Sequence, residues 1–76
     1  MLDMSKLPVL SGKELIKILQ KAGFEFRRQK GSHVILVKES IKKAVVVPIH
    51  SEIDKGTLIE IIRQAGMTRE QFLQLL

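Results

Sequence analysis

The spacing of apolar residues predicts an amphipathic helix near the start of the chain. Apolar residues recur every three or four positions between Ser11 and Gly23, as they do on one face of an α-helix. Ser11 and Glu14 have the spacing of a capping box, in which each side chain accepts a hydrogen bond from the other residue's backbone amide. The helix is expected to begin at Ser11 and to end at Gly23. Its predicted apolar face consists of Leu15, Ile16, Ile18, Leu19 and Ala22.

The following residues change to the period of two that indicates a β-strand. In residues 24–28 apolar and polar side chains alternate, so Phe24 and Phe26 are expected to face the core. Gly31 and Ser32 are residue types that favour a turn, and they are expected to end this first strand region.

Two further strands are expected after that turn. Residues 33–38 contain four consecutive apolar side chains, which indicates a central strand with both faces at least partly covered. Residues 44–47 are expected to form a third strand that ends at Pro48, because proline suits a strand end or a sheet edge. A polar loop of residues 39–43 joins them, and connections this short make the strands antiparallel.

Two more helices are expected in the last third of the chain. Asp54 or Thr57 can cap the first of them, and Gly66 is expected to end it. Thr68 and Gln71 have the spacing of a second capping box, which opens a short terminal helix. The predicted inward residues are Leu58, Ile59, Ile61, Ile62 and Ala65 in the first helix, and Phe72, Leu73 and Leu76 in the second.

Together these elements predict one α+β domain over residues 1–76, in the order α-β-β-β-α(-α), with helices on one face of a three-stranded antiparallel sheet. Residues 1–4 are expected to be a flexible lead-in. No apolar run approaches the roughly 20 residues of a membrane span, and the start lacks the pattern of a signal peptide. Cysteine is absent, which excludes disulfides and thiolate metal sites and favours a cytoplasmic setting.

The net charge of +5 is unevenly distributed. Residues 24–43 contain six Lys or Arg against two acids, whereas residues 44–76 contain three against four. Clustered positive charge favours a polyanionic partner such as nucleic acid. The alternative is that a small protein carries excess charge only for solubility.

The charge maximum coincides with the residues best suited to chemistry, which we call the basic segment (residues 27–33). His33 is a candidate general acid or base, because histidine titrates near neutral pH. The amides of a Gly-Ser turn can bind a phosphate, arginine can contact it through two nitrogens and lysine as a point charge. The candidate phosphate-binding residues are Arg27, Arg28, Lys30, Gly31 and Ser32.

Other interpretations of the polar residues remain open. A single histidine at the start of a strand is often structural, and this applies to His33. His50 is interpreted first as a residue making polar loop contacts together with Ser51, and second as a further proton-transfer group. Two histidines without cysteine or a paired spacing on one helix do not predict a zinc site. A nucleophile elbow, a P-loop and a dinucleotide glycine motif are absent from the sequence, so neither a metal nor a cofactor is expected.

Several short motifs, in this order and spacing, resemble the HicA (YcfA-like) family of toxins. The resemblance covers essentially the whole chain from Ser5 onward. The motifs are Leu7-Pro8, Ser11-Gly12-Lys13-Glu14, Gly23-Phe24, Arg28-Gln29-Lys30-Gly31-Ser32-His33, Val46-Val47-Pro48-Ile49-His50, Gly56-Thr57-Leu58, Gln64-Ala65-Gly66-Met67 and the tail with Glu70, Phe72 and Leu75-Leu76.

The resemblance implies a fold like that of double-stranded-RNA-binding domains. It also implies the activity of a type II toxin that cleaves mRNA independently of translation and inhibits growth. The family's catalytic histidine, in a Gly-Ser-His motif, corresponds to His33. The implied partner is a HicB antitoxin that covers the toxin's active surface, with acidic residues at the contact.

Two non-catalytic alternatives remain: a double-stranded RNA binder and a protein-interaction module. Domains that bind duplex RNA usually carry a lysine cluster at the start of the last helix, whereas residues 53–57 contain one lysine beside Asp54. If Phe24, Phe26 and Phe72 all pack inward, no aromatic side chain remains for stacking on bases. Selection among RNA sequences is therefore expected to be weak, or to depend on contacts with the RNA backbone.

Overall fold

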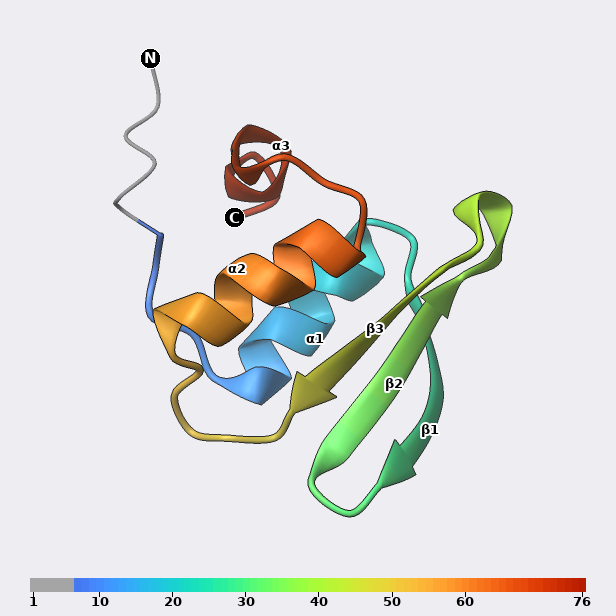
Figure 1. Ribbon diagram of the computed structural model, residues 1–76, viewed down its shortest axis with the longest axis horizontal. Coiled ribbons are helices and arrows are strands. Elements are labelled where there is room, and N and C mark those ends of the chain that lie inside the picture. The colour runs from blue at the N-terminus through green and yellow to red at the C-terminus, as the bar shows by residue number, and fades with distance from the viewer. Residues whose placement is uncertain (1–6) are drawn as a thin grey trace.

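The computed structural model describes residues 7–76, and its elements follow the predicted order (Figure 1). The three strands form one antiparallel sheet in the order β1-β2-β3, with β2 in the centre. The predicted α+β class and α-β-β-β-α-α order are confirmed, whereas the predicted lead-in at residues 1–4 lies outside the described residues. The elements are α1 (Gly12–Lys21), β1 (Glu25–Lys30), β2 (His33–Lys38), a 3-10 turn η1 (Glu39–Ile41), β3 (Lys43–Pro48), α2 (Lys55–Gln64) and α3 (Arg69–Leu73).

Helices cover one face of the sheet and leave the other face open. Helices α1 and α2 both pack against β3, and β1 is the strand farthest from them (Figure 1). The buried residues of β2 and β3 alternate with exposed or half-buried ones as far as Val47, as expected for a sheet covered on one side, and Pro48 at the end of β3 is buried as well. The core includes Leu15, Leu19, Phe24, Val34, Leu36, Val45, Val47, Leu58, Ile61, Ile62 and Phe72.

The predicted helix caps are confirmed. Ser11 and Glu14 form both hydrogen bonds of a capping box, and Thr68 and Gln71 form the same pair at the start of α3. Asp54 is the cap of α2. These bonds satisfy amide groups that the first turn of a helix leaves without partners, so the sequence fixes where each helix begins.

A lysine from the sheet stabilises the end of α1. The amino group of Lys38 donates a hydrogen bond to the carbonyl oxygen of Ala22, at 2.7 Å, just after the last turn of α1. The carbonyl groups at a helix C-terminus carry partial negative charge and have no partners within the helix. Lys38 therefore holds the far end of β2 against α1, and this cation is engaged in the fold.

The prediction for Phe26 is wrong. Phe26 is opposite the buried Leu36, on the side of the sheet that the helices cover, yet 53% of its surface is exposed. The cause is its strand: β1 is the sheet edge farthest from the helices, so the helical layer does not reach it (Figure 1). Phe24, just before β1, is buried as predicted.

The chain ends also differ from the prediction. Leu76 was expected to point inward but is 55% exposed, whereas Leu75 is half-buried against the core. At the other end, Leu7 and Leu10 belong to the core, and the Leu10 carbonyl accepts a 2.8 Å hydrogen bond from the amide of Ile53. The packed structure thus begins before the first helix.

Candidate active site

The basic segment forms the end of β1, a tight turn and the start of β2. Lys30 and His33 are opposite each other, so Gly31 and Ser32 make a two-residue hairpin turn. Gly31 has φ of 60° as the first turn residue, the position where a type II′ hairpin requires glycine. A Cβ added to Gly31 would meet nothing within 4 Å. Glycine is therefore favoured at position 31 by the backbone conformation and not by a lack of space, because there is room for a side chain.

The turn places three site residues on one face of the sheet. Lys30 is opposite His33 and Arg28 is opposite Ile35, so their side chains lie on the face that the helices leave open. Val46, opposite Ile35 on the other side, is 43% exposed and shows that this face is uncovered. Arg28, Lys30 and His33 are all exposed there.

A β-bulge at Arg27 lies between Phe26 and the cationic end of β1. Phe26 is opposite Leu36 and Arg28 is opposite Ile35, so β1 has one residue more than β2 across this step. Strict alternation would put Phe26 and Arg28 on the same face. The extra residue lets Phe26 lie on the side of the helices while Arg28 lies on the open face.

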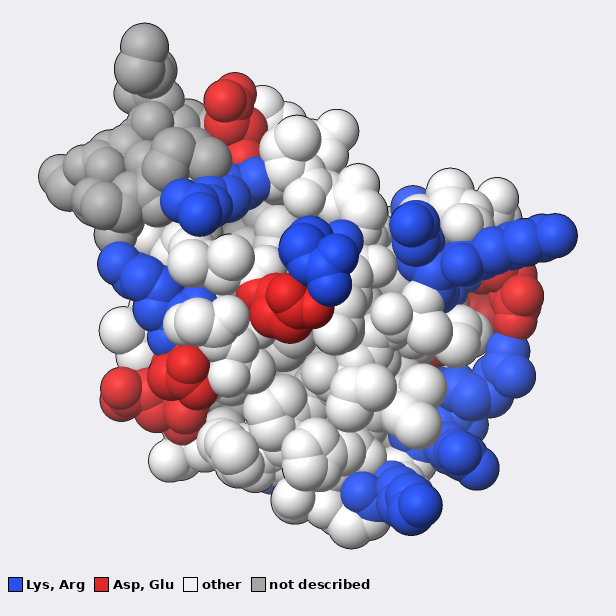
Figure 2. All heavy atoms as spheres, viewed as in Figure 1, with Lys and Arg blue, Asp and Glu red and all other residues white. Residues whose placement is uncertain are grey.

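The three predicted cations are not equivalent. Arg27 is paired with Glu39, with 2.5 Å between Nη2 and Oε2. Within residues 7–76, the side chains of Arg28 and Lys30 have no hydrogen bond or ion pair. Two of the three cations are therefore open to a ligand. Figure 2 shows Lys and Arg side chains following the β1 side of the molecule, whereas charges of both signs are mixed over the helices.

Gln29 is a site residue that the sequence analysis missed. Its side-chain amide donates a 2.9 Å hydrogen bond to the carbonyl oxygen of Gly31. The bond spans the start of the turn and restrains the residues that precede His33. No sequence motif marks such a contact, because a glutamine in a strand is usually only a solvent-facing residue.

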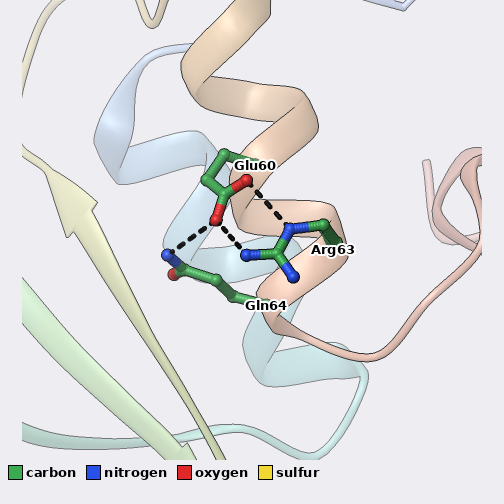
Figure 3. A network of polar contacts seen from close by, with 3 residues as sticks. All are labelled: Glu60, Arg63 and Gln64. Carbon is green, nitrogen blue, oxygen red and sulfur yellow. Dashed lines mark hydrogen bonds and ion pairs between the residues drawn. The ribbon is translucent and has the colours of Figure 1, made fainter.

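Arg63, outside the basic segment, is more fully engaged than Arg28 and Lys30. On α2, Arg63 donates two hydrogen bonds to Glu60, at 2.9 and 2.5 Å, and Gln64 donates a longer one at 3.4 Å (Figure 3). The hydrogen bonds from Arg63 hold the pKa of Glu60 below its usual value, and Glu60 raises the pKa of Arg63. This pair leaves little net charge on the exposed side of α2.

His33 is accessible, and its ring makes no hydrogen bond to any residue of the described part of the chain. The neighbouring backbone is bound to the residue that follows β3, because the amide of Ile49 donates a 2.7 Å hydrogen bond to the Ser32 carbonyl. Two shallow surface hollows, of about 360 and 300 Å³, are lined by other residues. The site is thus an open surface at the hairpin tip, a shape that can accommodate a polymer.

Two further searches concern the described residues only. Among residues 7–76, no group of three or more His, Cys, Asp or Glu side chains is arranged to hold a metal ion. In the same range, no helix has the length and apolar character needed to cross a bilayer.

The fold and the site define a class of protein. A three-stranded antiparallel sheet with helices on one face, in the order α-β-β-β-α-α, is an α+β fold like that of double-stranded-RNA-binding domains, here with an open basic tip. The family model described as the HicA toxin of bacterial toxin–antitoxin systems matches residues 12–67. The chain therefore belongs to the HicA toxin family. No curated protein was found to match it.

Proposed function

We propose that this chain is the toxin of a type II toxin–antitoxin system and acts as a metal-independent endoribonuclease on mRNA. The observation that carries the proposal is the shared open face of Arg28, Lys30 and His33 at the hairpin tip. Membership of the HicA toxin family supports the toxin role. An mRNA substrate would place the activity in the cytoplasm.

His33 is proposed as the general acid or base of the cleavage. RNA can be cleaved when its 2′-oxygen attacks the adjacent phosphorus and the 5′-oxygen leaves, which requires one proton to be removed and one to be delivered. A positioned histidine can perform either transfer near neutral pH, and such a group contributes roughly 10²–10⁴-fold to the rate. The open ring of His33 allows a backbone phosphate to reach it.

Arg28 and Lys30 are proposed to bind the phosphate on which charge develops, supported by the backbone amides of Gly31 and Ser32. Alternate residues on a strand are about 6.6–6.8 Å apart, so the two cations can contact neighbouring parts of one RNA backbone. Electrostatic stabilisation of this kind lowers the barrier where negative charge builds up. Arg27 has the weaker claim, because Glu39 already neutralises it.

The proposed partner is a HicB antitoxin that covers the open face of the sheet. That face combines exposed apolar surface at Val46 with the unpaired cations of the hairpin tip. An antitoxin surface with acidic residues around an apolar centre would match it. Such a contact would bury His33 and block the substrate.

The start of α2 argues against duplex binding as the main role. The Asp54 carboxylate occupies that position, accepting hydrogen bonds from the Thr57 amide at 3.0 Å and from the Thr57 hydroxyl at 2.7 Å. These hydrogen bonds from Thr57 hold the pKa of Asp54 below its usual value, so the group stays anionic. A carboxylate at this point repels a phosphate, whereas duplex-binding domains usually carry lysines there.

The test is RNA cleavage in EDTA, resolved on a gel, by the wild type and by His33→Ala at equal concentrations of folded protein. Ser40→Ala, an exposed change in η1 at the other end of β2, is the matched control. We expect cleavage by the wild type and the control, and loss of roughly 10²-fold or more in His33→Ala. Equal results from all three proteins, whether cleavage or none, would remove His33 from the mechanism.

A further inference from the structure

The two histidines of the chain lie at the same corner of the sheet. His33 begins β2, and its partner across the ladder is Pro48, the last residue of β3. The ladder continues one step further, because the amide of Ile49 donates to the Ser32 carbonyl at 2.7 Å. His50 follows one residue later, so it lies close to the start of β2.

That hydrogen bond limits the separation of the two histidines. Ser32 directly precedes His33, and Ile49 directly precedes His50. Adding standard backbone dimensions to the 2.7 Å bond puts the two histidine Cα atoms within about 10 Å of each other. The side chains are long enough for both rings to reach one phosphodiester group between them.

The backbone at His50 is held in place while its ring stays open. The His50 carbonyl accepts a 2.9 Å hydrogen bond from the amide of Gly12, at the start of α1. A Cβ at Gly12 would come to 2.1 Å from the Pro48 carbonyl oxygen, so only glycine permits this approach. His50 is exposed, and its ring has no hydrogen bond to the residues from Leu7 onward. The loop contacts expected of a purely structural His50 are made by its main chain.

We propose that His50 is the second proton-transfer group of the cleavage, complementing His33; this rests on the proposed ribonuclease function. One imidazole accepts the proton of the 2′-hydroxyl as the 2′-oxygen bonds to phosphorus. The other imidazole, in its protonated form, gives a proton to the 5′-oxygen as the bond between phosphorus and that oxygen breaks. The products are a 2′,3′-cyclic phosphate and a free 5′-hydroxyl, with no net change in protons.

Other charged groups on the elements that meet here will shape the pH dependence. The hairpin contributes the Lys30 ammonium, and the first turn of α1 contributes Lys13 and Glu14. The loop of His50 itself contributes Glu52. Hydrogen bonds from Ser11 hold the pKa of the Glu14 carboxyl below its usual value, so it titrates well below the range where histidine does.

The first experiment measures the pH–rate profile of His50→Gln, with Ser51→Ala as the control in the same exposed loop. Glutamine keeps the backbone carbonyl that Gly12 uses. We expect His50→Gln to cleave roughly 10²-fold more slowly and to lose one limb of a bell-shaped profile, while Ser51→Ala retains both limbs. An unchanged rate and an unchanged bell for His50→Gln would overturn the proposal.

The second experiment assigns the two proton transfers. An RNA with sulfur in place of the bridging 5′-oxygen has a leaving group that needs no proton. We expect this substrate to restore cleavage in one of the two variants, His33→Ala or His50→Gln, and not in the other. Restoration in neither variant would contradict a shared acid–base mechanism.

A third measurement does not depend on turnover. The chain has only two histidines, so their Hε1 ring protons give two NMR signals. We expect both to shift on addition of a 2′-O-methyl RNA, which cannot be cleaved in this way. A shift of the His33 signal alone, with His33→Ala inactive, would overturn the role of His50 and leave the ribonuclease function intact. Absence of cleavage by the wild type would overturn both.

Discussion

The β1–β2 hairpin and helix α2 each present an exposed arginine to solvent, but the two are held differently. On α2, Glu60 binds the Arg63 guanidinium through two hydrogen bonds. On the hairpin, Arg28 has no partner among the residues from Leu7 to Leu76. Charge counted along a sequence is therefore different from charge available to a ligand. The hairpin therefore offers an arginine that is open to a ligand, whereas α2 does not.

The same contrast holds for apolar groups. Phe72 in α3 is fully buried, whereas Phe26 in β1 is more than half exposed. The helices, β3 and the inward residues Val34 and Leu36 of β2 form the buried core, whereas β1 and the hairpin tip extend beyond the helical layer (Figure 1). Stability and the proposed chemistry are thus concentrated in different parts of a 76-residue chain.

The largest expected effect compares these two phenylalanines. Phe72→Ala removes a fully buried ring and should lower the free energy of unfolding by about 3–5 kcal/mol. Phe26→Ala makes the same chemical change at an exposed site and should lower it by less than about 1 kcal/mol. Urea denaturation followed by circular dichroism measures both. Similar losses in the two variants would mean that β1 is packed more tightly than its exposure indicates.

The next prediction compares the two arginines. Arg28→Ala should weaken binding of a non-cleavable RNA and reduce the slope of log affinity against log salt by about 0.7, the value for one phosphate contact on a single strand. Arg63→Ala should leave that slope unchanged, because Glu60 already pairs with Arg63. Fluorescence anisotropy at several salt concentrations gives the slopes. Equal slopes in Arg28→Ala and the wild type would exclude a phosphate contact at Arg28.

A smaller effect is expected at Gln29. Loss of its hydrogen bond to the Gly31 carbonyl should slow cleavage about 2–10-fold, in line with the 0.5–1.5 kcal/mol of a typical hydrogen bond. Gln29→Ala and Gln29→Glu both remove the donor, whereas Gln29→Lys retains one and should recover part of the rate. Gln20→Ala, in the exposed side of α1, is the control. Equal rates in all four variants would limit Gln29 to a surface role.

The smallest effect concerns the loss of folding stability at acid pH, which is expected to come from carboxylates at the helix caps. Hydrogen bonds at the helix caps lower the pKa of Glu14 and Asp54 from ordinary values of 4.5 and 3.8. A lowered pKa in the folded state means that the unfolded state binds protons first as the pH falls. The stability these groups contribute is therefore present at neutral pH and is lost as the pH falls through their folded pKa values.

Asp54→Asn tests this, because asparagine caps a helix about as well as aspartate but does not titrate in this range. The variant should lose less stability than the wild type between pH 7 and roughly pH 3, measured by urea denaturation at each pH. An identical loss in both proteins would show that the Asp54 carboxylate contributes nothing to acid sensitivity.

Local signals in the sequence were sufficient for most of the fold. The capping residues Ser11, Asp54 and Thr68 mark helix starts, because their side chains bond amides only a few residues away. The strand order follows from the short turns. It was harder to predict which face of the sheet each β1 side chain occupies. A two-residue turn sets Arg28 and Lys30 opposite β2 residues of the open face. Strict alternation from Arg28 would then place Phe26 on the open face as well, which conflicts with an inward Phe26. That conflict was the sequence signal for a bulge.

The candidate site was predictable in its location and not in its contacts. The cluster of Arg27, Arg28, Lys30 and His33 marks the hairpin tip. The pairing of Arg27 with Glu39 depends on where the chain goes after β2, which no local pattern specifies. The approach of residues 48–50 to the Ser32 carbonyl and to α1 is equally non-local, and it brings His50 to the corner that His33 occupies.

The bulge at Arg27 also governs which changes of length the gene can tolerate. Losing the codon for Arg27 would remove the extra residue of β1 and leave every later side chain on its present face. Gaining one codon between Arg28 and Lys30 would turn Arg28 toward the helical side, because the turn fixes the register from the other end. An in-frame insertion of a single amino acid there would remove Arg28 from the open face, although the protein would keep every residue of its proposed active site.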